Sequence, residues 1–196
     1  QPVVVLENGE WLVPVFYCVT EPGEKWVGNQ DVSAVKISAD QGATWQEYAV
    51  PQSRGCVHMN VEKLPDGSLA AFFRSRWADH VYVSRSQDNG RTWSEPETTE
   101  LPNNNSSIQV TCLQNGHLAM VCNLSSAADA KERRVSLYDE IEEEEAAPQQ
   151  APAAREMESD GKEAFWGAPR APMSLLISTD GGRTWAERDS GADISC

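Results

Sequence analysis

The chain has 196 residues and a formal net charge of −14, which results from 30 acidic and 16 basic residues. Such an excess of acid argues against a nucleic-acid partner, because a nucleic-acid-binding surface needs clustered Lys and Arg. Hydrophobic residues make up 40% of the chain, and no apolar run approaches the roughly 20 residues of a membrane-spanning helix. We therefore expect a soluble domain with a core of ordinary size and no membrane span.

The first predicted unit covers about residues 1–50 and consists of four short strands. Apolar runs at residues 3–5, 11–18 and 32–37 are separated by a Gly-containing turn and a polar loop. Short apolar runs between such turns are typical of β-strands. The chain starts at Gln1, next to a strand-like run, so we expect it to begin after processing or inside a longer parent.

A short motif, Ser-x-Asp-x-Gly-x-Thr-Trp, closes this unit and occurs three times in the chain. Its Asp accepts hydrogen bonds from nearby backbone N–H groups, its Gly allows a positive φ, and its Trp packs between sheets. The motif is thus typical of a tight turn between two strands, and an Asp repeated in every unit is unsuited to act once as a catalytic acid. The expected structural positions are Asp40, Gly42, Trp45, Asp88, Gly90, Trp93, Asp180, Gly182 and Trp185.

The second unit is predicted over residues 55–98 and the third over residues 106–189, with the same order of strands, turns and box. The third unit is interrupted at residues 126–172 by an insertion in which acidic residues, Ala, Pro and Gln are frequent. Because such a composition buries little apolar surface, we expect the centre of the insertion to be disordered or a solvated loop. An acidic tail that binds a partner is the alternative. Residues 134–138 and 165–170 mix aromatic residues with Arg and are expected to be ordered.

The boxes and the four-strand units resemble the Asp-box, or BNR, repeats of sialidases and sialidase-like proteins. The segments Leu101-Pro-Asn-Asn-Asn-Ser-Ser-Ile108 and Pro169-Arg-Ala-Pro-Met173 further resemble the bacterial sialidase-like branch. This resemblance implies an all-β fold, a β-propeller of four-stranded antiparallel blades, with about three blades in this chain and six in the parent. A propeller ring needs at least about four blades, so we expect sequence outside this chain or another subunit to complete the ring.

The topology of such blades places a candidate site at the end opposite the boxes. The starts of the inner strands, the ends of the second strands and the loops that follow meet there, near the axis. Arg binds carboxylates bidentately, amides bond to hydroxyls and aromatic rings stack on sugars, so the residues at this end suit an acidic sugar. The substrate-binding candidates are Arg54, Arg74, Arg76, Trp77, Asn103, Asn105, Gln109 and Arg170, and the catalytic candidates are Asp79 as a general acid and His58 as an acid or base. The same end holds further polar and aromatic residues, namely Glu21, Lys25, Trp26, Asp31, His80, Asn104, Ser106, Asn123 and Trp166.

Each main candidate also has a structural interpretation. Arg74 or Arg76 would brace a neighbouring blade, and His58 would be a hydrogen-bonded residue of an inner strand. Asp79 would cap a turn, and Trp77 would pack under a loop. The sequence leaves both interpretations open at these positions.

Sialidases bind the sialate carboxylate with three arginines, use a Tyr nucleophile assisted by a carboxylate, and protonate the leaving oxygen with an Asp. The resemblance therefore implies an exo-acting glycoside hydrolase that removes a terminal acidic sugar such as sialic acid from a glycan. The chain lacks the Phe-Arg-Ile-Pro segment of many sialidases, and Tyr138 has no identifiable Glu beside it. Two alternatives stay open: a uronate-active polysaccharide lyase that uses His58 as base or acid, and a non-catalytic propeller that binds glycans or proteins.

No motif in the chain indicates a metal or a cofactor. The five Cys form no Cys-x-x-Cys pair and no zinc-type spacing with His, so we expect most of them to be small buried hydrophobic residues. The box loops lack the twelve-residue pattern of a calcium loop. The expected partner is a glycan or an acidic sugar. Removal of a signal peptide would favour a secreted or periplasmic location, with a cytoplasmic one still open.

Overall fold

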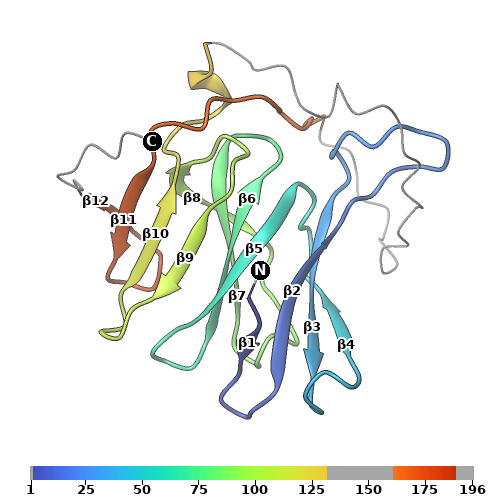
Figure 1. Cartoon of the computed structure of the whole chain (residues 1–196), viewed down its shortest axis with the longest axis vertical. Helices are drawn as coiled ribbons and strands as arrows, with labels where there is room; N and C mark the ends of the chain where they lie inside the picture. The colour runs from blue at the N-terminus through green and yellow to red at the C-terminus, as the bar shows by residue number, and fades with distance from the viewer. Residues whose placement is uncertain (1, 132–160, 189–196) are drawn as a thin grey trace.

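The computed structural model describes residues 2–131 and 161–188, and these residues form three four-stranded antiparallel sheets. Each sheet is a meander in chain order, and the three sheets stand side by side like the blades of a fan (Figure 1). The all-β prediction of about three four-stranded blades is therefore confirmed.

The strands of the first sheet are β1 (Val4–Val5), β2 (Trp11–Tyr17), β3 (Val32–Ser38) and β4 (Gln46–Ala49). The second sheet contains β5 (Cys56–Lys63), β6 (Leu69–Ser75), β7 (His80–Ser86) and β8 (Glu97–Pro102). The third contains β9 (Gln109–Cys112), β10 (Leu118–Cys122), β11 (Ser174–Ser178) and β12 (Ala186–Arg188).

Strand β8 continues past residue 98, where the second unit was expected to end. The single short 3-10 helix of the described residues, η1 (Ala127–Asp129), follows β10 at the start of the insertion. The acidic run at 139–145 and the segment 134–138 lie outside the described residues. In the described ranges, no helix is long and apolar enough to cross a membrane.

The core consists of two apolar layers, one on each face of the second sheet. Every residue of β6 is buried. Because successive side chains of a strand point to opposite faces, Phe73 packs in the layer toward the first sheet and Phe72 in the layer toward the third. This explains why residues 69–73 of β6 form a continuous apolar run, whereas β10 alternates in burial and leaves Val121 39% exposed.

Cysteines take part in this packing to different degrees. Cys56 and Cys122 are buried in the two layers, Cys112 is half-buried and Cys18 is exposed, all with free thiols. The expectation of buried, structural Cys residues therefore fits Cys56 and Cys122 but not Cys18. Cys196 lies outside the described residues.

The three boxes form the turns β3–β4, β7–β8 and β11–β12. In the second box, the Asp88 carboxylate accepts hydrogen bonds from the Thr92 N–H at 2.8 Å and the Thr92 hydroxyl at 2.6 Å, while Trp93 Nε1 donates to the Gly90 carbonyl at 2.9 Å. Asp40 and Asp180 make the corresponding bonds to Thr44 and Thr184. The box carboxylates therefore close the turns by accepting these hydrogen bonds. In Figure 1 the β3–β4 and β11–β12 turns lie at the lower ends of their sheets. The end opposite the boxes, where the candidate site is expected, is therefore the upper end.

Candidate functional site

Residues 161–173, here called the rim segment, return from the insertion and cross the upper ends of the sheets (Figure 1). The segment bonds to all three sheets in turn. The Ala164 N–H donates to Asn29 Oδ1 at 2.8 Å in the loop before β3, and the Phe165 N–H donates to the Arg76 carbonyl at 2.8 Å after β6. Its far end, at Pro172, accepts a bond from Asn123 Nδ2 at 2.7 Å after β10. The rim segment therefore ties the upper ends of the three blades together.

Arg76 follows β6 and is buried under the rim segment. Its Nε and Nη2 both contact Asp31 Oδ2 at 2.8 Å, in the loop before β3. Its guanidinium lies 4.8 Å from the Trp166 ring centroid and 5.5 Å from that of Trp26, distances typical of cation–π contacts. Since the ion pair and the rings surround it, Arg76 acts as a bracing residue that joins the second blade to the first.

Arg74 lies at the end of β6 and is only 8% exposed. Its Nε donates to Asn105 Oδ1 at 2.8 Å, and Asn105 Nδ2 donates to the Phe165 carbonyl at 2.8 Å. Asn105 has φ +59°, a left-handed conformation that Asn tolerates better than most residues. One amide thus holds Arg74 on one side and the rim segment on the other.

Asn103 and Asn104, in the turn before β9, are buried and bond within the protein. Asn103 Oδ1 accepts the N–H groups of Ser75 and Asn105 at 3.1 and 3.0 Å. Asn104 Nδ2 donates to the Pro169 carbonyl at 2.7 Å. These bonds shape the turn before β9 and fasten the rim segment to it, and sugar binding by these amides stays a prediction.

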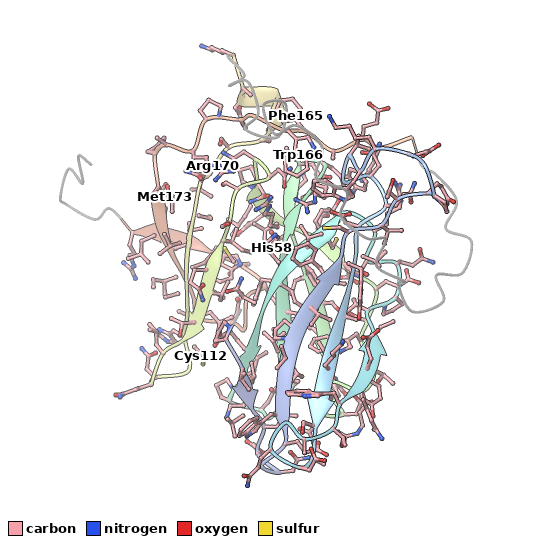
Figure 2. The ribbon with its side chains drawn as sticks, turned by 45° about the vertical axis from the view of Figure 1, so that its right-hand side comes forward. His58, Cys112, Phe165, Trp166, Arg170 and Met173 are labelled. Atoms are coloured by element: carbon pink, nitrogen blue, oxygen red, sulfur yellow. The ribbon has the colours of Figure 1, made fainter. Side chains whose placement is uncertain are left out.

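His58 occupies an irregularity in β5, where the register with β6 shifts and the backbone φ is +51°. Its half-buried ring packs against Phe16 with centroids 4.3 Å apart. Figure 2 shows His58 beneath Phe165, Trp166 and Arg170, which lie along the upper edge. Burial, and then the charges of Arg74 and Arg76, lower the pKa of His58 to about 4. The imidazole is therefore neutral at pH 7, and the charges of two guanidinium groups act on it.

Asp79 lies in the loop after β6, half-buried and strongly hydrogen-bonded. Ser75 Oγ donates to it at 2.5 Å, the His80 N–H at 2.7 Å and the Tyr82 hydroxyl at 2.8 Å, with Lys162 Nζ 3.7 Å away. Burial raises the pKa of the Asp79 carboxyl, but these bonds outweigh it, so the pKa lies below the usual value. A general acid needs the opposite shift, and the arrangement therefore suits an ionised turn cap.

Arg54 and Trp77 form a second pair near the first blade. The Arg54 guanidinium lies 4.8 Å from the Trp77 ring centroid, and its Nη1 donates to the Asn29 carbonyl at 3.1 Å. The ring also packs so closely on Gly55 that a Cβ there would overlap it. Gln109 on β9 and Arg170 on the rim segment are exposed, and no bond described in the structure joins either of them to His58, Arg74 or Arg76.

A tyrosine–glutamate pair occurs in the first blade, between Tyr17 and Glu47. Burial, and then the hydrogen bond and charge of Glu47, raise the pKa of Tyr17 to about 12. The phenol is therefore protonated at pH 7 and donates its hydrogen bond to the Glu47 carboxylate. Tyr138, the tyrosine considered from the sequence, lies outside the described residues.

Sequence reasoning placed Asp31 and Trp26 at this end without assigning them a role, and it missed Phe16 and Asn29. Asp31 is fully buried although it follows a polar loop, and nothing local in the sequence indicates its partner. A Trp and an Asp five positions apart before a strand were the available signal, because Trp26 Nε1 donates to Asp31 Oδ1 at 2.8 Å. Among the described residues, no group of three or more His, Cys, Asp or Glu is placed to hold a metal ion.

The BNR repeat-like domain family matches residues 1–189 of this sequence. The chain belongs to this family. No curated protein matches the chain. Among solved structures, it is similar to the Hadza microbial sialidase Hz136, with a TM-score of 0.58, 15% identity and 93% of this chain covered.

Two further solved structures show the same fold. The Trypanosoma rangeli sialidase has a TM-score of 0.56 and 16% identity over 93% of this chain, and the intramolecular trans-sialidase from Ruminococcus gnavus has 0.51 and 14% over 91%. The chain covers 28%, 24% and 29% of the Hz136, T. rangeli and R. gnavus chains, respectively. It therefore has the sialidase-like β-propeller fold but spans less than a third of their length.

Proposed function

We propose that this chain is part of an exo-acting glycoside hydrolase of sialidase type, which removes a terminal acidic sugar from a glycan. The observation that carries the proposal is that Asn105 holds Arg74 at the upper end of β6, where the charges of Arg74 and Arg76 act on a neutral His58.

The chemistry of the two side chains fits an acidic sugar. A guanidinium binds a carboxylate with strong, directional hydrogen bonds, and a neutral imidazole donates to one hydroxyl or accepts from another. Arg74 is therefore proposed to bind the sugar carboxylate and His58 an adjacent hydroxyl. Arg76 braces the loop before β3 through its ion pair with Asp31, while Asp79, Asn103 and Asn105 shape the surrounding turns.

A second candidate function rests on the same histidine. A neutral imidazole next to a guanidinium that neutralises a uronate carboxylate is suited to abstract the proton beside that carboxylate. His58 is neutral at pH 7, because burial and then Arg74 and Arg76 lower its pKa to about 4, and the same low pKa makes it a weak base. A uronate-active polysaccharide lyase is accordingly the alternative, and its product is an unsaturated sugar that absorbs in the ultraviolet.

The test uses the protein that carries this chain and a fluorogenic aryl glycoside of N-acetylneuraminic acid. The Arg74→Met variant should lower kcat/KM by about 10- to 100-fold, the loss expected when a hydrogen-bonded charge is removed. The matched control is Arg91→Met, because Arg91 lies in a box turn and bonds Glu10 at 2.8 Å. Full activity in Arg74→Met would reject the proposal.

A parallel assay separates the alternatives. Ultraviolet absorbance that grows on a polyuronate, without release of the fluorophore from the sialoside, would select the lyase. Binding on a glycan panel without turnover of either substrate would select a non-catalytic propeller. A neutral aryl galactoside serves as the control for charge, since it lacks the carboxylate that Arg74 is proposed to bind.

A further inference from the structure

Asn105 makes more connections at this end than a sugar-binding side chain would need. Its side-chain oxygen accepts the Arg74 Nε–H at 2.8 Å, its side-chain nitrogen donates to the Phe165 carbonyl at 2.8 Å, and its backbone N–H donates to Asn103 Oδ1 at 3.0 Å. The residue is only 4% exposed. Both ends of its amide therefore point at protein groups.

The orientation of this amide follows from its partners. Arg Nε–H is only a donor and a peptide carbonyl only an acceptor, so the oxygen must face Arg74 and the nitrogen must face Phe165. A flipped amide would place donor against donor and acceptor against acceptor. The two bonds consequently define one position for the Arg74 guanidinium relative to the rim segment.

We propose that Asn105 is a positioning residue, which fixes the Arg74 guanidinium for carboxylate binding by linking it to the rim segment, and does not itself touch the substrate. The inference rests on the proposed function for the role of Arg74, but the link between Asn105, Arg74 and Phe165 stands on the geometry alone. It replaces the expectation that Asn105 binds the sugar directly.

The rim segment takes part because it is anchored on both sides of Phe165. The Phe165 N–H bonds the Arg76 carbonyl at 2.8 Å, and the Pro169 carbonyl bonds Asn104 at 2.7 Å. Phe165 thus presents its carbonyl to Asn105 from a fixed place. A residue of the third blade's insertion thereby sets the position of an arginine of the second blade.

Two substitutions at Asn105 distinguish its hydrogen bond to Arg74 from its hydrogen bond to Phe165. Asn105→Gly keeps the left-handed backbone, which Gly adopts readily, but removes both side-chain bonds. Asn105→Asp also tolerates the backbone and keeps an oxygen for Arg74, but it loses the donor to Phe165. The control is Ser107→Gly, an exposed position in the same turn.

The first readout is the NMR signal of the Arg74 Nε–H, identified by its loss in Arg74→Lys. This signal is independent of any substrate. In Asn105→Gly the Nε–H should exchange with water at least about 10-fold faster, as expected for loss of a buried bond to a charged group, whereas Asn105→Asp should retain the slow exchange. Unchanged exchange in Asn105→Gly would overturn the proposal.

The second readout is kinetic and uses the sialoside substrate. Asn105→Gly should raise KM by about 10-fold, and Asn105→Asp should raise it too, because it keeps the contact to Arg74 but loses the link to the rim segment. A wild-type KM in Asn105→Asp would show that the link to the rim segment does not position Arg74, and the proposal would be wrong. A wild-type protein that does not turn over the sialoside rejects the proposed function, while the Nε–H measurement still decides the role of Asn105.

Discussion

Arg76 and Asp31 form a buried ion pair between two blades, with Nη2 and Oδ2 2.8 Å apart and side chains that are 3% and 0% exposed. The second carboxylate oxygen of Asp31 accepts the Trp26 Nε1–H at 2.8 Å and the Val19 N–H at 3.2 Å. Every side of this carboxylate is therefore occupied. The pair fixes the loop before β3 against the end of β6, directly under the rim segment.

We predict that Asp31→Asn lowers the free energy of unfolding by about 3–5 kcal/mol, because it leaves the Arg76 charge buried without its counter-charge. Urea denaturation measures the loss. The control is Glu10→Gln, which removes the partner of the half-exposed Arg91 and should cost no more than about 1 kcal/mol. Equal losses in the two variants would contradict a special role for the buried pair.

The fold could be predicted from the sequence because its signals are local. The box places Ser, Asp, Gly, Thr and Trp within one turn, and the bonds that close it, such as Thr92 to Asp88, span four positions. Strands were visible as short apolar runs between such turns, most clearly the fully buried β6. Residues that form a structure with their neighbours in the chain can be recognised without knowing the rest.

The candidate site could be located but not interpreted, because its partners are distant in the chain. Asn105 and Phe165 are 60 positions apart, and Arg76 and Asp31 are 45 positions apart. Their position at the start of an inner strand and the chemistry of the amide group made the Asn residues candidates for binding a sugar. The structure shows that they bond to backbone groups that only the folded chain brings near, so their role depends on tertiary contacts.

A comparison of two glycines should isolate steric overlap from backbone strain. Gly182 and Gly67 both have φ +83°, but a Cβ at Gly182 would overlap the buried Phe72 ring, whereas nothing lies within 4 Å of one at Gly67. Gly67→Ala should cost about 1 kcal/mol for the left-handed backbone. Gly182→Ala should cost roughly 2 kcal/mol more for overpacking. Thermal or urea unfolding that gives equal losses would show that the core yields around Phe72.

The anchoring of the rim segment predicts a change in hydrogen exchange. Asn104→Ser removes the bond to the Pro169 carbonyl and should loosen the segment on that side. The Phe165 amide, which bonds the Arg76 carbonyl, should then exchange about 3- to 10-fold faster, in line with the net contribution of one hydrogen bond. Asn115→Ser is the matched control, because Asn115 is exposed and bonds only locally to His117. Identical exchange in both variants would mean that Asn104 does not anchor the segment.

His58 predicts a specific dependence of stability on pH. Its ordinary pKa of 6.5 falls to about 4 in the folded protein, through burial first and then Arg74 and Arg76. Between these values the unfolded chain binds a proton that the folded chain does not, so the free energy of unfolding must rise with pH. The contribution is fully present above pH 6.5 and is lost as the pH falls toward 4.

The variant His58→Asn tests this prediction, since Asn tolerates the positive φ of position 58 and does not titrate. Its unfolding free energy should fall less steeply than that of the wild type between pH 6.5 and 4. The difference should be on the order of 1–2 kcal/mol across the window, after allowance for solvent screening of a half-buried ring. Urea denaturation at several pH values gives both curves, and the difference cancels the carboxylates common to the two proteins. Parallel curves would show that His58 takes up its proton equally in the folded and unfolded chains, and that the two arginines do not act on it.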